Sequence, residues 1–294
     1  MISSHFPTRV KQYKLISLIY SSPNSVIYSS IDPQTSQKLI LKLINKNRIP
    51  SKQYDTETKI SMTISHPYLL RALKFFDISD FRVLLFPRVM HGDLQSWIRS
   101  GKVNSIEIAA KIMFRLVCAV SYLHSQKILH GDIKSQNVLM LSTSTDDPHP
   151  SLIDYGFSTF LNHDEYCHCT LATVNHAAPE LLAFQPHSFP SDIWSLGITF
   201  YNIIRGRTPY PNVESALLQS LILTKQISFY GGLFQMSPPS LATMIKKMLS
   251  IDPENRPTAS ELLNDPFFLD ILDHSFIHSE IEDTLLQDSK FSRF

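Results

Sequence analysis

The chain contains the stretch His130-Gly131-Asp132-Ile133-Lys134-Ser135-Gln136-Asn137, and Asp154-Tyr155-Gly156 follows it after a short connection. Transfer of a phosphoryl group from ATP requires one carboxylate that orients the acceptor hydroxyl, together with oxygen ligands that hold magnesium on the phosphates. Asp132 and Asn137 lie close together in sequence, and Asp154 adds a second carboxylate. Any one of these side chains alone could belong to a solvated loop, but the ordered set indicates phosphoryl-transfer chemistry.

This stretch resembles the catalytic loop of protein kinases (H-R-D-x-K-x-x-N) and their metal-binding D-F-G, each with one substitution. Other motifs follow in the order of that family. They are Leu39–Lys42, which resembles V-A-I-K, Ala178–Glu180, which matches A-P-E, and Asp192–Gly197, which matches D-x-W-S-x-G. On these motifs the chain is identified, over roughly residues 12–269, as a member of the eukaryotic protein kinase superfamily, serine/threonine type. The branch that it resembles is the calcium/calmodulin- or AMP-activated one.

The resemblance implies a role for each residue of the loop. Asp132 would orient or accept the proton of the substrate hydroxyl, and Lys134 would neutralise charge on the transferring phosphoryl group. Thr173 resembles the threonine that supports the catalytic aspartate. Asn137 and Asp154 would bind Mg²⁺, because hard oxygen ligands suit that ion.

The same resemblance implies an ATP site. Lys42 would contact the α- and β-phosphates, and Glu57 would pair with Lys42 and hold it in place. Arg256 would pair with Glu180 of A-P-E. The remaining nucleotide contacts that the family's pattern implies are Leu18, Val26, Ile40, Phe86, Val89, Asp93 and Leu139.

The chain departs from the family where the nucleotide would bind. The glycine-rich loop is missing, since the family's glycines would fall at Ile19, Ser21 and Asn24. Glycine there lets the backbone approach phosphates without obstruction by a side chain. Ile40 stands where the family places alanine against adenine, and the extra bulk could cost roughly 1–3 kcal/mol. We therefore expect weakened or altered ATP affinity.

Three further departures bear on regulation and substrates. Gly131 replaces the arginine of H-R-D, which in many relatives grips a phosphate on the activation loop. Gln136 and Asn202 stand where arginine-directed relatives carry glutamates. Because both side chains are neutral, a strong preference for arginine-rich substrates is not expected.

Composition agrees with a folded protein. Apolar residues make up 43% of the 294 residues, charged residues 18%, and the formal net charge is +1. This balance argues against a disordered chain and against a strongly basic nucleic-acid binder. Three cysteines offer no disulfide framework. No stretch approaches the ~20 apolar residues that span a bilayer, and no signal-peptide run is evident, so we expect a cytoplasmic protein without membrane partners.

The pattern of elements predicts an α+β, bilobal protein-kinase fold with a strand-rich N-lobe and a helical C-lobe. The expected strands are Tyr13–Tyr20, Ser25–Ile31 and Lys38–Ile44. A helix around Tyr54–Ser65 is expected next, and then further strands, the last of them Phe81–Phe86. Later helices are expected after an N-cap at Asn104 and at Asp192–Ile204, capped by Ser191. The expected divisions are residues 1–11 (extension), 12–89 (N-lobe), 90–269 (C-lobe) and 270–294 (tail).

Two alternatives remain beside an active kinase for protein substrates. A pseudokinase that senses ATP or acts as a scaffold is favoured by the lost glycines and by Ile40, and opposed by the intact polar residues. A small-molecule kinase is favoured by His-Gly-Asp followed by Asn137, which resembles the aminoglycoside and choline kinases. Those enzymes generally lack the A-P-E segment and the D-x-W-S-x-G helix. The sequence indicates neither the physiological substrate nor the oligomeric state.

Overall fold

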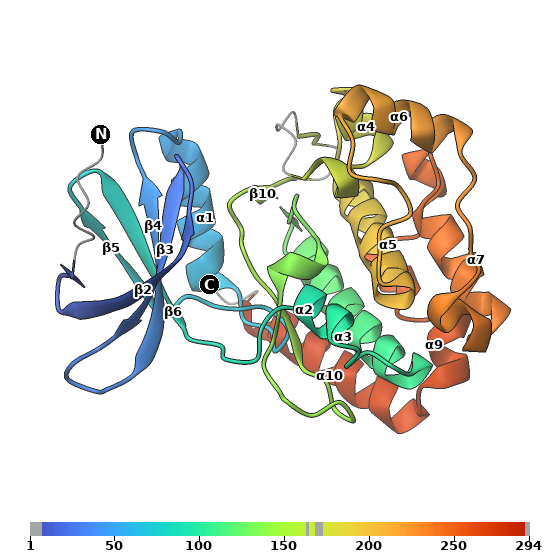
Figure 1. Cartoon of the computed structure of the whole chain (residues 1–294), viewed down its shortest axis with the longest axis horizontal. Coiled ribbons are helices and arrows are strands. Elements are labelled where there is room, and N and C mark those ends of the chain that lie inside the picture. Colours follow the sequence, from blue (N-terminus) through green and yellow to red (C-terminus); the bar gives the residue numbers. More distant parts are fainter. Residues whose placement is uncertain (1–7, 163–164, 168–172, 292–294) are drawn as a thin grey trace. The chain divides into compact units, whose positions relative to one another are not determined.

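The computed structural model describes residues 8–162, 165–167 and 173–291 of the chain. The chain divides into two compact units, of which one comprises Met1–Ile64 and Leu70–Met90 and the other Ser65–Leu69 and His91–Phe294. The first unit holds a six-stranded sheet, and the second is mostly helical (Figure 1). This arrangement confirms the expected α+β class, with a strand-rich and a helical lobe. In the described part of the chain, no helix is long and apolar enough to cross a membrane.

The sheet of the first unit has the strand order β1-β2-β3-β4-β6-β5, and all its neighbouring strands are antiparallel. The strands run through residues rich in Leu, Ile, Val and Tyr, which suit a pleated, half-buried surface. Their bounds are β1 Arg9–Val10, β2 Tyr13–Ser21, β3 Ser25–Ile31, β4 Lys38–Asn45, β5 Lys74–Ile78 and β6 Phe81–Pro87. The strands expected from the sequence agree with β2, β3, β4 and β6 to within one residue.

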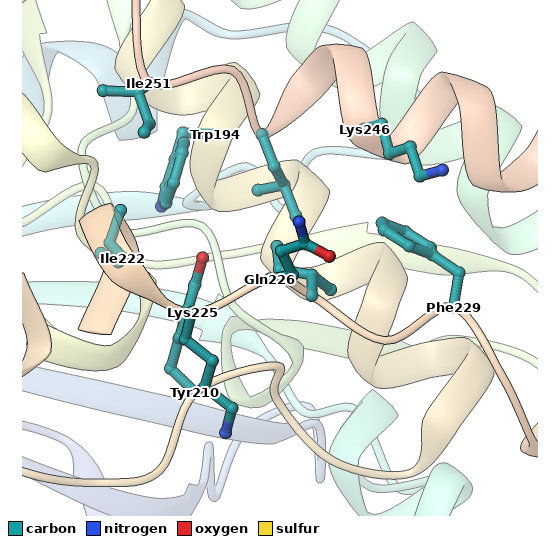
Figure 2. Close-up of a pocket in the computed structure, with 10 residues that line it drawn as sticks. Trp194, Tyr210, Ile222, Lys225, Gln226, Phe229, Lys246 and Ile251 are labelled. Atoms are coloured by element: carbon teal, nitrogen blue, oxygen red, sulfur yellow. The ribbon is translucent and has the colours of Figure 1, made fainter.

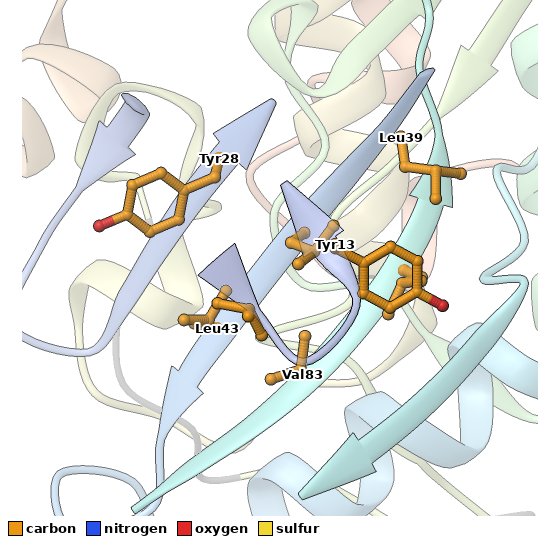
Figure 3. Close-up of a cluster of buried hydrophobic side chains, with 8 residues drawn as sticks. Tyr13, Tyr28, Leu39, Leu43 and Val83 are labelled. Carbon is orange, nitrogen blue, oxygen red and sulfur yellow. The ribbon is translucent and has the colours of Figure 1, made fainter. Parts of the chain in front are cut away.

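One face of this sheet carries an apolar cluster, which Figure 3 draws as sticks. Its members include Tyr13, Tyr28, Leu39, Leu43 and Val83, each less than a tenth exposed. The only helix among the described residues of this unit is α1, Ser51–Thr63. It begins three residues and ends two residues earlier than expected, with Pro50 as its N-cap residue.

The helical unit is built around two long, largely buried helices, α3 (Ile106–Ser125) and α5 (Phe189–Arg205). Both lie in the interior of the helical region in Figure 1. The other α-helices are α2 Leu94–Arg99, α4 Pro179–Leu182, α6 Ser215–Thr224, α7 Pro239–Met248, α8 Ala259–Leu262, α9 Pro266–Ile271 and α10 His274–Phe291. The short strands are β7 Ile128–Leu129, β8 Val138–Met140, β9 Pro150–Leu152 and β10 Thr159–Phe160. The 3-10 turns are η1 Ser135–Asn137, η2 Val174–His176, η3 Gly232–Met236 and η4 Pro253–Asn255.

The starts of the two long helices differ from the expectation. Ser105, not Asn104, is the N-cap residue of α3, and its hydroxyl accepts a hydrogen bond from the Ile108 amide at 3.2 Å. Helix α5 begins at Phe189 rather than Asp192, with Ser188 at the N-cap. The cause is Pro190, whose fixed φ and missing N–H suit the first turn of a helix.

Residues of the expected tail form the helix α10, which packs against α3 (Figure 1). Glu280 is the centre of this contact and is only 6% exposed. The Arg115 guanidinium donates two hydrogen bonds to Glu280 Oε1, at 2.8 and 2.9 Å, and the Tyr68 hydroxyl donates to Glu280 Oε2. The segment Ser65–Leu69 is also held through His66, whose Nε2 lies 3.1 Å from the Thr284 hydroxyl. The tail helix is therefore an integral part of the helical unit.

His66 is expected to make the protein sensitive to acid. Burial lowers the pKa of this imidazole from 6.5 to about 3. Between these pH values the unfolded chain binds more protons than the folded one, so the free energy of unfolding decreases as pH falls from about 6.5 towards 3. Thermal unfolding of the wild type and of His66→Gln across this range measures the effect. The substitution should flatten the dependence, and an equal slope in both proteins would contradict this origin.

Candidate active site

Three side chains hold the carboxylate of Asp132, and the residue as a whole is only 5% exposed. Its Oδ1 accepts a hydrogen bond from the Thr173 hydroxyl at 2.6 Å. Its Oδ2 accepts from Lys134 Nζ at 2.7 Å and from Asn137 Nδ2 at 2.8 Å. Lys134 Nζ also donates to the Thr173 hydroxyl at 2.7 Å. Four residues that the sequence assigned to catalysis or metal binding therefore lie in one cluster.

The loop that carries Asp132 is fixed to helix α5 by Asp192. This buried carboxylate accepts hydrogen bonds from the backbone amides of His130 at 2.8 Å and Gly131 at 2.9 Å. It also contacts Nε2 of His124 at 3.0 Å. Burial alone raises the pKa of Asp192, but the hydrogen bonds from His124 and the Gly131 amide outweigh it and hold the pKa below its usual value. The D-x-W-S-x-G motif thus positions the catalytic loop.

Asn137 and Asp154 are brought near each other by the backbone between them. The Ile153 amide donates to the Asn137 carbonyl at 2.9 Å, and the Ile153 carbonyl lies 3.2 Å from His130 Nε2. Asp154 follows directly and adopts a φ of 69°, a left-handed conformation that costs about 1–3 kcal/mol in residues other than glycine. Such strain is found most often at functional sites, which agrees with the metal-binding role expected for Asp154.

Lys42 and Glu57 form an ion pair within the strand-rich unit. Lys42 Nζ lies 2.6 Å from Glu57 Oε1, and the two side chains are 12% and 4% exposed. Lys42 comes from β4 and Glu57 from the buried side of α1. This is the pairing that the resemblance implies.

The register of the sheet places two of the expected nucleotide contacts, Val26 and Leu18, on the face opposite Lys42. Directly paired residues of antiparallel strands point to the same face, and Lys42 pairs with Ile27, whereas Val26 pairs with Leu43. Val26 packs against the apolar cluster on the other face, and Leu18 pairs with Tyr28 of that cluster. Ile27, which sequence reasoning missed, is therefore the β3 residue that shares the face of Lys42.

The remaining expected contacts fall in both units. Ile40 pairs with Phe86, so these two side chains lie on the Lys42 face, and both are half-buried. Val89, also half-buried, follows β6. In the helical unit an isolated bridge pairs Asp93 with Leu139, and the Asp93 carboxylate caps α2 by accepting from the Ser96 amide at 2.6 Å. Asp93 thus has a structural role of its own.

Arg256 and Glu180 form the second expected ion pair. Arg256 Nη1 and Nη2 donate to the two carboxylate oxygens of Glu180 at 2.7 and 2.8 Å, and the Arg256 side chain is fully buried. Its guanidinium also lies over the Trp194 ring, 5.2 Å from the centroid. This parallel two-bond geometry is the strong form of an arginine–carboxylate contact. It joins the A-P-E segment, which leads into α4, to the residue that follows η4.

The protein kinase domain family matches residues 14–268 of the chain. The chain belongs to the protein kinase family. Among its relatives is the ovarian-specific serine/threonine-protein kinase Lok of Drosophila melanogaster, 27% identical over 88% of this chain and 54% of that protein. The DNA damage response protein kinase DUN1 of Saccharomyces cerevisiae is 25% identical over 92% of this chain and 57% of that protein. The rat serine/threonine-protein kinase DCLK1 is 26% identical over 90% and 61%.

These relatives confirm the expected superfamily and its serine/threonine type. The chain spans a little over half the length of the Lok and DUN1 kinases that it matches. The matched range contains the residues of the Asp132 cluster and of the Lys42–Glu57 pair.

Gly131 occupies the place of the arginine in H-R-D, and the structure gives it a reason to be glycine. Its φ is +79°, and a Cβ built there would lie 2.7 Å from the carbonyl oxygen of Phe157. Restoring the family's arginine should therefore strain the catalytic loop rather than improve it.

Gly131→Arg is expected to lower both thermal stability and phosphoryl-transfer rate. Gly101→Arg is the matched control, because Gly101 has a similar φ of +72° but nothing within 4 Å of a Cβ. Both variants should lose about 1–3 kcal/mol from the left-handed backbone, and Gly131→Arg should lose more. Differential scanning calorimetry measures this. Equal melting temperatures for the two variants would show that the Phe157 contact has no consequence.

Two pockets of similar size lie in the helical unit. One, of about 530 Å³, is lined by Trp194, Tyr210, Phe229 and residues of α6 and α7 (Figure 2). It contains none of the residues of the Asp132 cluster. The other, of about 540 Å³, includes Thr173 of that cluster. Among the described residues, no group of three or more His, Cys, Asp or Glu side chains is arranged to hold a metal ion.

Proposed function

We propose that this chain is a protein serine/threonine kinase that transfers the γ-phosphate of Mg-ATP to Ser or Thr hydroxyls of protein substrates. The observation that carries the proposal is the Asp132 carboxylate, held on both oxygens by Thr173, Lys134 and Asn137. A carboxylate fixed in this way presents a defined acceptor to a substrate hydroxyl. Membership of the protein kinase family supports the same reading.

The residues of the cluster have separate tasks. Asp132 accepts a hydrogen bond from the incoming hydroxyl and so orients its oxygen lone pair towards the phosphoryl group. The Lys134 ammonium lies 2.7 Å from both Asp132 and the Thr173 hydroxyl, where it offsets negative charge. Thr173 couples the carboxylate to the segment that leads into A-P-E, so the orientation of Asp132 depends on that segment being in place. When bound, Mg-ATP supplies the phosphoryl group and the divalent charge.

The donor set fits a magnesium ion. Asn137 uses its amide nitrogen for two hydrogen bonds to Asp132, which leaves its Oδ1 without a donor among the described residues. This amide oxygen and the Asp154 carboxylate are hard oxygen ligands of the kind that Mg²⁺ prefers. Lys42, oriented by Glu57, offers an ammonium for the phosphates. On the Lys42 face of the sheet, Ile27, Ile40 and Phe86 would provide apolar surface for adenine.

The pseudokinase alternative rests on a specific observation. Ile40 lies on the Lys42 face beside Phe86, so the β-branched side chain narrows the surface on which adenine would pack. No glycine stands between Leu18 and Val26 to let the phosphates approach the backbone. A kinase with these changes is expected to turn over at or below the low end of about 1–100 s⁻¹.

An acceptor panel distinguishes the candidate functions. The purified chain is incubated with Mg-ATP and either a mixed Ser/Thr/Tyr peptide pool, choline and aminoglycosides, or no acceptor, while ADP release and ATP binding are followed. ADP release that requires the peptides, with phosphate on Ser and Thr, supports the proposal. ATP binding without release would favour the pseudokinase, and release with the small molecules alone would favour a small-molecule kinase.

A further inference from the structure

A pocket of about 540 Å³ opens beside the Asp132 cluster, with Thr173 in its wall. The Thr173 hydroxyl donates to Asp132 Oδ1 at 2.6 Å, so a substrate segment bound in this pocket would lie next to the Asp132 carboxylate. The wall is formed by residues of the end of α2, η1, η2 and the segment after α5. All these elements belong to the helical unit. The pocket is thus placed to contact residues that flank the accepting Ser or Thr.

The charged side chains in the wall of this pocket are all positive. Among the described residues of the wall, Arg99, at the end of α2, and Arg207, two residues after α5, are the only ionisable ones apart from His176, and none is Asp or Glu. Both arginines are exposed, and neither makes an ion pair or a hydrogen bond within the described part of the chain. Their guanidinium donors are therefore available to a ligand. Guanidinium groups bind carboxylates and phosphates through two parallel hydrogen bonds.

The inner wall of the pocket is rigid and neutral. Asn202 Nδ2 donates to Gln95 Oε1 at 2.7 Å and to the Ser135 hydroxyl at 2.8 Å, and Ser135 donates to the same Gln95 oxygen at 2.8 Å. These side chains are all less than a tenth exposed. The Asn202 amide nitrogen thus donates its hydrogen bonds inside this buried network and does not contact a charged side chain of a substrate. Among the described residues that line the pocket, none carries a carboxylate.

His176 adds unsatisfied polar groups to the same wall. It is 6% exposed, and both its ring nitrogens lack a hydrogen-bond partner among the described residues. Burial and the nearby Lys134 ammonium lower its pKa to about 4, so the imidazole is neutral at physiological pH. A neutral imidazole has one donor and one acceptor nitrogen. A buried polar atom that makes no hydrogen bond costs free energy. The two ring nitrogens of His176 therefore point to a polar ligand segment as their hydrogen-bond partner.

We propose that this pocket binds an anionic side chain of the protein substrate, a carboxylate or a phosphate, close to the accepting Ser or Thr. This inference rests on the proposed kinase function and names the substrate class for it. Arg99 and Arg207 supply the attraction, and Thr173 couples the occupied pocket to the catalytic carboxylate. The chain would therefore select acidic or previously phosphorylated sequences, the opposite of an arginine-directed kinase.

A peptide library tests the selectivity. Each peptide carries one Ser, and each flanking position is varied in turn among Asp, phosphoserine, Asn and Lys, with transfer from Mg-ATP as the readout. At one position or more, Asp or phosphoserine should raise kcat/KM about tenfold over Asn, and Lys should lower it. The Asp and phosphoserine arms identify which anion is preferred. Equal rates for all four residues at every position, or a preference for Lys, would overturn the proposal.

Charge reversal assigns the effect to this pocket. In the double variant Arg99→Glu, Arg207→Glu the preference should invert, so that Lys peptides exceed Asp peptides. Arg71→Glu is the matched control, because Arg71 is exposed, forms no ion pair with any described residue and belongs to the other unit. The control should retain the acidic preference. An acidic preference that survives in the double variant would place the recognition elsewhere and contradict the proposal.

A binding arm separates failure of the pocket from failure of the proposed function. Fluorescence anisotropy of labelled peptides, with Ala in place of the accepting Ser, reports affinity without turnover. Absence of transfer to every peptide would refute the kinase function, yet tighter binding of Asp or phosphoserine peptides that is lost in the double variant would still support the pocket. Equal affinities for acidic, neutral and basic peptides would overturn it whether or not transfer occurs. The preference should weaken as salt is raised, because these arginines are exposed.

Discussion

Replacing Asp132 with Asn is expected to lower the rate of phosphoryl transfer by about 10²–10⁴. The amide oxygen of Asn can still accept a hydrogen bond from the substrate hydroxyl, but it cannot take up the proton and carries no charge, so the base and its negative charge are lost together. The substitution also turns an NH₂ group towards one of three donors, those of Thr173, Lys134 and Asn137. Because these donors are held by other contacts, the loss should fall on turnover rather than on folding.

Steady-state kinetics with a peptide substrate measures the effect of Asp132→Asn on kcat. Asp146→Asn is the matched control, since Asp146 lies in an exposed bend of the same unit. Its backbone carbonyl accepts a hydrogen bond from Lys111, but its side chain makes no hydrogen bond or ion pair within the described part of the chain. The control should retain wild-type kcat, and both variants should retain the wild-type melting temperature to within a few degrees. An Asp132→Asn protein with full activity would refute the assignment of the base.

Replacing Glu280 with Ala is expected to lower the free energy of unfolding by about 3–5 kcal/mol. The Arg115 side chain is 7% exposed and would be left in the interior without the carboxylate that accepts two of its hydrogen bonds. The Tyr68 hydroxyl would lose its acceptor as well. Burial, helped by Glu280, already raises the pKa of Tyr68, so this hydroxyl remains neutral and keeps its proton to donate.

Urea denaturation of Glu280→Ala measures this loss. Glu282→Ala, on the same helix, is the control, because the Glu282 side chain is 62% exposed and should cost no more than about 0.5 kcal/mol. Replacing both partners with apolar residues, as in Arg115→Met with Glu280→Leu, should recover much of the lost stability, because no buried charge is then left unpaired. Asp147, which also pairs with Arg115, has a side chain that is 70% exposed, so water can solvate its carboxylate. If Glu280→Ala and Glu282→Ala unfolded at the same urea concentration, α10 would not be the structural element described.

Much of the candidate site is local in sequence, which is why it could be predicted. Asp132, Lys134 and Asn137 are close neighbours in one loop, and their contacts follow from the turn that η1 makes. The Lys42–Glu57 pair could also be predicted, because the two residues lie in β4 and in α1, the next element along the chain. Motif spacing is sufficient for such contacts, because the backbone between the residues has few ways to run.

The register of the first hairpin was not predictable to one residue. A slip of one residue exchanges the faces of a strand, and the turn between β2 and β3 has no glycine to fix its geometry. Two irregularities in the β2–β3 pairing add further shifts. Val26 and Ile27 are both apolar, so composition does not choose between them. Only the pairing of Lys42 with Ile27 places Ile27 on the Lys42 face.

Contacts between residues far apart in the sequence could not be predicted either. Glu280 meets Arg115 and Tyr68 across 165 and 212 residues, and no spacing rule connects those positions. The same holds for the pocket beside Thr173. The neutral residues Gln136 and Asn202 indicated that basic substrates are not favoured, but Arg99 and Arg207 come from separate elements that only the fold brings into one wall.

Transfer of labelled γ-phosphate from ATP to a peptide pool, with wild type and Asp132→Asn measured side by side in magnesium and in EDTA, tests the kinase assignment. We expect label on Ser and Thr with the wild type in magnesium, almost none with Asp132→Asn, and none in EDTA. Folded wild-type protein that transfers no label, or equal labelling by both proteins, would contradict it.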